Sequence, residues 1–141
     1  MAIKQLNPYL IFNCTAGKAI KLYETALGAK TESVSHFGDV PGGEAKPETK
    51  DRVIHALLRV GAGTLMISDS RPEDAPALAG NVHVSLDFED VADMEKKFTA
   101  LAAGGKIAMP PQDTFWGARF GMLTDAFGIQ WMLNCTTKPA A

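Results

Sequence analysis

Two histidines and one arginine are the residues of this sequence best suited to contact or transform a small molecule. His55 and His83 each lie in a predicted strand, and an imidazole can transfer a proton near neutral pH or bind a metal. Arg119 follows a Trp-Gly pair, and its planar guanidinium suits an anionic or carbonyl-bearing ligand. Each has a structural interpretation too, because strand histidines are often half-buried and Arg119 can pair with Asp113 or Asp125.

Other common kinds of chemistry have no counterpart in the sequence. No nucleophile, base and orienting group stand at a recognisable spacing, and the glycines lie in predicted turns rather than in a phosphate-binding loop. Cys14 and Cys135 are far apart and are expected to be reduced thiols without a redox role.

Alternation of side chains along the predicted strands indicates which residues share a face. Polar and apolar residues alternate cleanly around His83, which predicts a half-buried strand with His83 on the polar face. The same argument puts His55 with Arg59, and Met132 with Asn134, on one face of their strands.

The predicted elements occur twice in the same order. The first set is a strand at 7–13, a helix at 16–27 capped by Thr15, and strands at 30–37, 53–60 and 64–68. The second set is a strand at 82–88, a helix at 91–102, and strands at 106–109, 120–123 and 129–133. Between them lie a charged, Pro/Gly-rich loop at 38–52 and a linker at 69–80. A strand-helix-strand-strand-strand unit is therefore repeated at an offset of roughly 75 residues.

Length and composition favour one compact unit with a small-molecule partner. The 141 residues are 46% hydrophobic, which suffices for one substantial core. The formal net charge is −2 with both signs interspersed, a pattern that argues against nucleic-acid binding. The N-terminus has no secretory pattern and no apolar run approaches the ~20 residues of a membrane span, so we expect a cytoplasmic protein without a membrane partner.

The stretch from Asp113 to Asn134 resembles the last hairpin of the vicinal oxygen chelate (glyoxalase/bleomycin-resistance/dioxygenase) superfamily. The resemblance rests on W-G-x-R, an aliphatic strand, D-x-x-G and an apolar strand; F-W-G-x-x-F-G…T-D-x-F-G-x-x-W-M is similar to the PhnB-like (3-demethylubiquinone methyltransferase-like) branch. The first set adds V-x-H-A…R…M-x-S-D at 53–56, 59 and 66–69. The resemblance implies an α+β fold of duplicated β-α-β-β-β modules, 1–70 and 81–137, within a single domain 1–141. In it, eight strands form a cupped mixed sheet with the helices outside.

The resemblance also implies where a metal would bind. Metal-dependent relatives place His or Glu at one position in the first and last strand of each module. The matching positions are Tyr9 (or Pro8), Met66, His83 and Met132. Only His83 is a metal-ligand type, and a divalent metal usually needs at least three nitrogen, oxygen or thiolate donors. We predict no cofactor and no usual metal site; a non-standard site of His83, His55 and a carboxylate is the alternative.

Alternation and resemblance together predict one ligand cavity with the 38–52 loop near its mouth. Its predicted lining is Tyr9, His55, Met66, His83, Arg119 and Met132. Polar groups above an apolar floor of Met and Tyr are typical of ligand pockets.

Three functional interpretations remain. The leading one is a small-molecule binding protein of the bleomycin-resistance type without a metal. The second is a lyase, isomerase or dioxygenase-type enzyme that uses a non-standard metal site or His83 as acid/base. The third is a structural or accessory protein with a filled cup. Methyl transfer is discounted, because no nucleotide-binding strand-helix unit is present. We expect a homodimer, since superfamily members cover exposed sheet edges by pairing chains.

Overall fold

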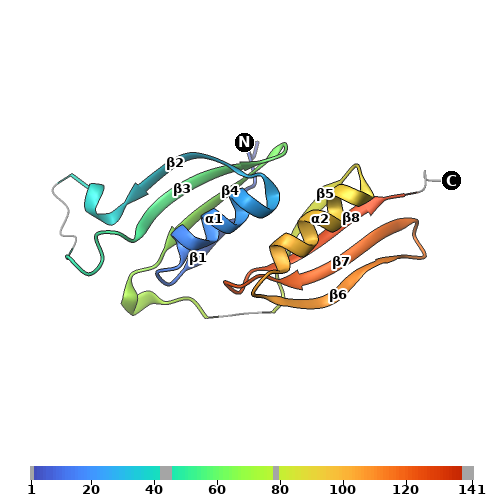
Figure 1. Cartoon of the computed structure of the whole chain (residues 1–141). Coiled ribbons are helices and arrows are strands. Elements are labelled where there is room, and N and C mark those ends of the chain that lie inside the picture. Colours follow the sequence, from blue (N-terminus) through green and yellow to red (C-terminus); the bar gives the residue numbers. More distant parts are fainter. Residues whose placement is uncertain (1, 42–45, 78–79, 138–141) are drawn as a thin grey trace. The chain divides into compact units, whose positions relative to one another are not determined.

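The structure is a computed structural model that describes residues 2–41, 46–77 and 80–137 (Figure 1). The chain divides into two compact units, Met1–Ala77 and Leu78–Ala141. Within these described residues, each unit has one four-stranded sheet and one α-helix. No helix in the described ranges is long and apolar enough to cross a membrane.

Both units have the same topology. The elements of the first are β1 (Tyr9–Phe12), α1 (Ala16–Leu27), β2 (Lys30–His36), β3 (Val53–Val60) and β4 (Gly63–Asp69). Those of the second are β5 (Val84–Phe88), α2 (Val91–Ala102), β6 (Lys106–Asp113), β7 (Ala118–Thr124) and β8 (Gln130–Thr136). The strand orders are β1-β4-β3-β2 and β5-β8-β7-β6, and in each sheet the first strand pairs with the last in parallel. The predicted α+β fold of duplicated β-α-β-β-β modules is confirmed.

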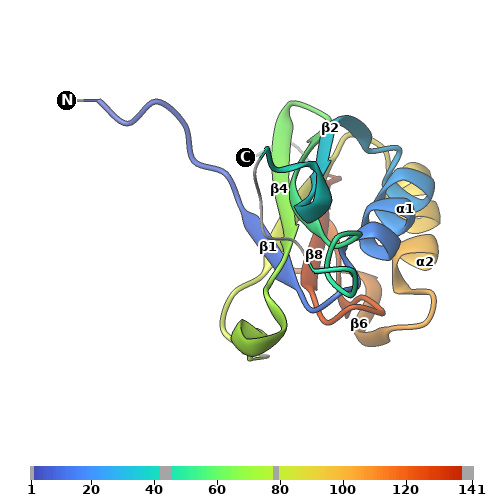
Figure 2. The same ribbon diagram turned by 90° about the vertical axis from the view of Figure 1, so that its left-hand side faces the viewer.

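Each helix covers one face of its own sheet. Helix α1 contacts β2, β3 and β4, and α2 contacts all four strands of the second sheet. Figure 2 shows α1 on one side only of the first sheet. The buried side chains of α1 are Ala16, Ala19, Ile20, Tyr23, Ala26 and Leu27, and those of α2 are Met94, Phe98 and Leu101. The apolar stripes predicted from the sequence therefore form the two cores.

Two local predictions are corrected. Thr15 makes no capping hydrogen bond; the carboxylate of Asp69 instead accepts the Ala16 N–H at 2.9 Å at the start of α1. Strand β6 continues past Met109 to Asp113 through two prolines. Proline is tolerated there because β6 is an edge strand whose register with β7 shifts around these residues.

Candidate functional site

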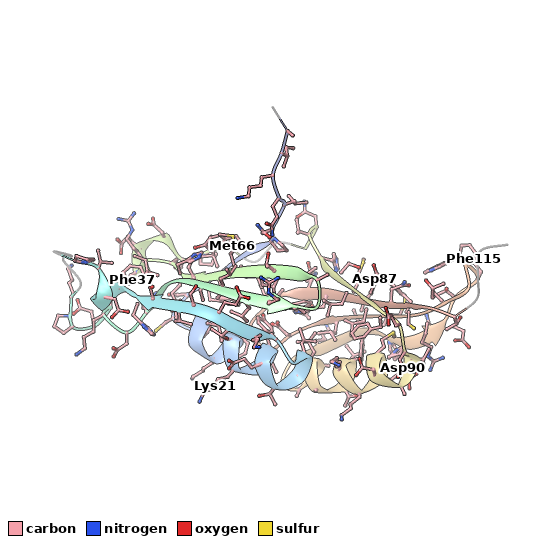
Figure 3. All side chains as sticks on the ribbon, turned by 90° about the horizontal axis from the view of Figure 1, so that it is seen from above. Lys21, Phe37, Met66, Asp87, Asp90 and Phe115 are labelled. Atoms are coloured by element: carbon pink, nitrogen blue, oxygen red, sulfur yellow. The ribbon has the colours of Figure 1, made fainter. Side chains whose placement is uncertain are left out.

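The face of the first sheet that α1 leaves uncovered, here named the first distal face, brings three predicted site residues together. Tyr9 of β1 lies beside Met66 of β4, and Leu57 of β3 lies on the other side of Met66. The Tyr9 hydroxyl is 3.2 Å from Nδ1 of His55, and the two rings are 5.9 Å apart. Figure 3 shows Met66 on the side of the sheet opposite α1. A phenol, an imidazole and a thioether thus share this face.

From His55 to Arg59 the burial of β3 follows the predicted alternation, whereas at its start the alternation breaks, since Val53 is buried and Ile54 is 37% exposed. Ala56 and Leu58 are fully buried, whereas His55 and Arg59 point to the opposite side. Arg59 Nε donates a hydrogen bond of 2.7 Å to Glu32 Oε1. This hydrogen bond and the positive charge of Arg59 lower the pKa of Glu32. Arg59 therefore forms an exposed ion pair on the first distal face.

The face of the second sheet turned away from α2, the second distal face, carries His83 and Met132. Met132 lies opposite Ser85 in the β5–β8 pairing, and Asn134 donates a hydrogen bond of 3.4 Å to Asp87. Trp131 and Leu133, which alternate with them, are 0% exposed. Figure 3 shows Asp87 on the side of its sheet opposite α2.

His83 and Gln130 have unpaired polar atoms on the second distal face. They immediately precede Val84 and Trp131, the first pair in the β5–β8 register, and continue the alternation of these strands. His83 Nδ1 and Gln130 Oε1 are buried and have no hydrogen-bond partner within the described part of the chain. Leaving such a group unpaired costs about 1–3 kcal/mol, so this position favours a polar partner.

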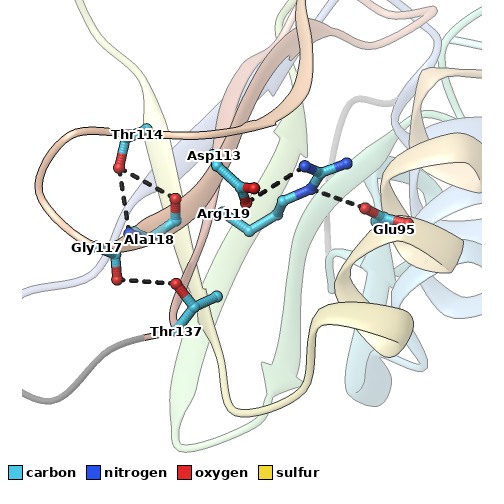
Figure 4. Close-up of polar contacts among 7 residues, drawn as sticks. All are labelled: Glu95, Asp113, Thr114, Gly117, Ala118, Arg119 and Thr137. Carbon is cyan, nitrogen blue, oxygen red and sulfur yellow. Dashed lines mark hydrogen bonds and ion pairs between the residues drawn. The ribbon is translucent and has the colours of Figure 1, made fainter.

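Arg119 is the predicted site residue that lies elsewhere. It stands opposite the buried Cys135, on the side of β7 that faces α2. Its Nε donates to Glu95 of α2 at 2.9 Å and its Nη1 to Asp113 at 3.4 Å (Figure 4). The hydrogen bond to Glu95 raises the pKa of Arg119. Arg119 therefore does not share a face with Met132, with which it was predicted to line one cavity, and its contact with Asp113 agrees with the alternative interpretation as an ion-pair partner.

Two residues of β7 that were not predicted as site residues lie on the second distal face. Phe120 lies opposite Asn134, and Met122 lies opposite Met132, so both are on the second distal face. The run from Phe120 to Leu123 is apolar without alternation, and only its pairing with β8 fixes which side each residue takes.

One buried aspartate, Asp125, explains the spacing of the T-D-x-F-G-x-x-W motif. Asp125, 3% exposed, accepts the N–H groups of Phe127 and Ile129 and the indole N–H of Trp131, which fixes the β7–β8 turn. In the hairpin before it, Thr114 and Ala118 share hydrogen bonds across the β6–β7 turn (Figure 4). The T-D-x-F-G-x-x-W motif is therefore architectural.

The donors at the positions implied for a metal fit a divalent ion poorly. Tyr9 offers a neutral phenol, and Met66 and Met132 offer thioethers, which bind such ions weakly. Within 2–41, 46–77 and 80–137, no group of three or more His, Cys, Asp or Glu side chains could hold a metal ion. The absence of a metal from the protein stays a prediction.

Comparison with known proteins agrees with this topology. Residues 5–133 match the model of the Glyoxalase/Bleomycin resistance protein/Dioxygenase superfamily. The chain belongs to this superfamily. Protein YjdN of Escherichia coli (strain K12) is 36% identical over 140 residues, covering 92% of this chain and 93% of that protein. The uncharacterized protein Rv0887c of Mycobacterium tuberculosis is 33% identical over 136 residues, covering 92% of this chain and 72% of that protein.

Solved structures of the superfamily share the fold of this chain. Protein PA1353 from Pseudomonas aeruginosa has a TM-score of 0.86 and 41% identity, and the match covers 96% of this chain and 100% of that one. A PhnB protein from Bacillus cereus has a TM-score of 0.76 at 23% identity, with 94% and 99% covered. The fosfomycin resistance protein FosX from Listeria monocytogenes has a TM-score of 0.67 at 12% identity, with 97% and 96% covered. The last two likenesses are of fold alone.

Proposed function

We propose that this protein binds a small organic molecule at its second distal face, without the divalent metal of the metal-dependent superfamily members. The observation that carries the proposal is the pair of buried, unpaired atoms, His83 Nδ1 and Gln130 Oε1. An imidazole nitrogen donates or accepts according to its tautomer, and an amide oxygen accepts. A ligand hydroxyl or amide group that reaches either atom would give it a hydrogen-bond partner.

The apolar part of such a ligand has suitable neighbours. Met122, Met132 and Phe120 lie on the same face of the second sheet as Gln130. Methionine side chains adapt to irregular apolar shapes. The expected ligand is therefore an apolar molecule with one or two uncharged polar groups.

A thermal-shift screen of small molecules tests this function. Compounds that raise the melting temperature of the wild type should lose most of that effect on His83→Ala. They should keep it on His36→Ala, a matched change at a histidine whose ring contacts Asp39 at 3.5 Å. The proposal fails if the best compounds stabilise His83→Ala as much as the wild type.

A second candidate is an enzyme of the lyase, isomerase or dioxygenase type. The contact of 3.2 Å between the Tyr9 hydroxyl and His55 Nδ1 favours it, because such a pair can move a proton to or from a bound carbonyl compound. Turnover of a bound compound that is lost in both Tyr9→Phe and His55→Gln would favour this candidate over simple binding.

We also propose that the protein is a homodimer in the cytoplasm. Strands β1, β2, β5 and β6 are sheet edges, and exposed edges are commonly covered by pairing with another chain. Apolar side chains at or near these edges are exposed, among them Val82 at 75% and Ile107 at 51%.

A further inference from the structure

A cavity of about 470 Å³ lies in the first unit, between the start of α1 and the segment that precedes β3. Its buried lining includes Val53 and Asp69, which are 2% and 6% exposed. None of Tyr9, His55 and Met66 lines it, so it is distinct from the first distal face. Its volume is within the range of small-ligand pockets.

One wall of this cavity is basic. Lys18 and Lys21 follow each other at i and i+3 on α1, and both are exposed. Neither ammonium group forms an ion pair with any residue that the structure describes. Gly17 lines the cavity beside them, and a Cβ at Gly17 would have nothing within 4 Å. Figure 3 shows Lys21 on α1.

The opposite wall carries two carboxylates, with Arg52 beside them in the lining. Glu48 and Asp51 lie in the turn before β3 and are also exposed. Within the described ranges, neither carboxylate is paired with a lysine or an arginine. The two walls therefore carry opposite charges that do not neutralise each other by direct contact.

Arg52 fixes the acidic wall to the rest of the unit. Its Nη1 donates to the side chain of Asn13 at 3.0 Å and to the carbonyl of Ser70 at 2.8 Å. The Arg52 carbonyl accepts the Phe37 N–H at 2.9 Å. The wall is thus tied to the ends of β1, β2 and β4 and is a built part of the unit.

Asp69 forms no ion pair with these lysines, because both of its carboxylate oxygens accept backbone N–H groups. One oxygen accepts the Ala16 N–H at 2.9 Å and the other accepts the Val53 N–H at 3.0 Å. A cavity with a basic and an acidic wall is complementary to a molecule that carries both charges. We propose that this cavity binds a small zwitterion, with its carboxylate at Lys18 and Lys21 and its amino group at Glu48 and Asp51.

The site is independent of the function proposed for the second distal face. Its four charged groups are exposed, and exposed ion pairs are weak, so we expect dissociation constants on the order of 1 mM. Both charges of the ligand contribute, so a molecule with only one of them binds at least tenfold more weakly.

Titration of ¹⁵N-labelled protein with amino acids of two lengths tests the proposal. 4-Aminobutyrate or 6-aminohexanoate should shift the backbone amide resonances of residues 17–21 and 48–53 in a saturable way. Hexanoate and hexylamine, each with one charge, should do so at least tenfold more weakly. Equal shifts with hexanoate or hexylamine, or no saturable shift with either zwitterion, would overturn it.

Amino-acid substitutions test whether the zwitterion binds in this cavity. Lys21→Glu and Glu48→Lys should each weaken binding at least fivefold, and Gly17→Leu should block it, since the space beside Gly17 is open. Lys96→Glu, the same charge change on an exposed position of α2, should leave binding unchanged. Unchanged binding in all three cavity variants would contradict the assignment, as would an equal loss in Lys96→Glu.

Discussion

The carboxylate of Asp69 joins three segments of the first unit. Asp69 is the last residue of β4. Its carboxylate accepts the N–H of Ala16 at the start of α1 and the N–H of Val53 at the start of β3. Asp69→Ala should lower the free energy of unfolding by about 2–4 kcal/mol, because two buried backbone donors lose an ionised acceptor. Urea denaturation measures this loss. Asp74→Ala, which removes an exposed partner of Arg71, should cost under about 0.5 kcal/mol, and equal losses would refute the role of Asp69.

Alternation in the sequence predicted the faces of His55, His83 and Met132, because polar and apolar residues alternate in those strands. It could not assign a face to Arg119, since β7 lacks alternation and takes its register from β8. It also missed Asp69 as the cap of α1, because that contact spans 53 residues. These positions are fixed by contacts between segments that are far apart in the sequence. Such contacts cannot be read from a single sequence.

Among the elements, β7 and α2 approach closely at one glycine. A Cβ on Gly121 would lie 2.7 Å from Cε2 of Phe98. Gly121→Ala should therefore destabilise the protein by about 1–3 kcal/mol through overpacking. Phe98→Leu in the same chain should recover part of this loss, which a double-mutant cycle in urea measures.

The matched control for Gly121 is Gly63→Ala. A Cβ at Gly63 would lie 3.6 Å from the nearest atom, the carbonyl oxygen of Val60, which is an ordinary contact. Its effect should be within about 0.5 kcal/mol of the wild type. If both alanine variants are equally stable, the close packing of Phe98 on Gly121 is contradicted.

At the scale of the whole molecule, we predict that the purified protein holds little bound metal. Purified, untagged protein should contain well under one equivalent of Zn, Ni, Mn or Fe by elemental analysis. Chelator should leave its melting temperature unchanged, because a tightly bound metal would add several kcal/mol of stability through linkage. Stoichiometric metal that is lost in His83→Ala would contradict the proposed metal-free binding.

A homodimer is the second prediction at this scale. Sedimentation at micromolar concentration should give twice the chain mass of 15.1 kDa, because paired chains would cover the exposed edges of the sheets. A species of 15.1 kDa under these conditions would count against the dimer.

The central claim is ligand binding at the second distal face, and the three histidines of the chain allow a direct measurement of it. Long-range ¹H–¹⁵N spectra of the imidazole rings should be recorded with and without the most stabilising compound from the thermal-shift screen. We predict that the ring nitrogens of His83 shift and saturate while those of His36 do not. A compound that binds without moving His83, or that moves only His36, would contradict the claim.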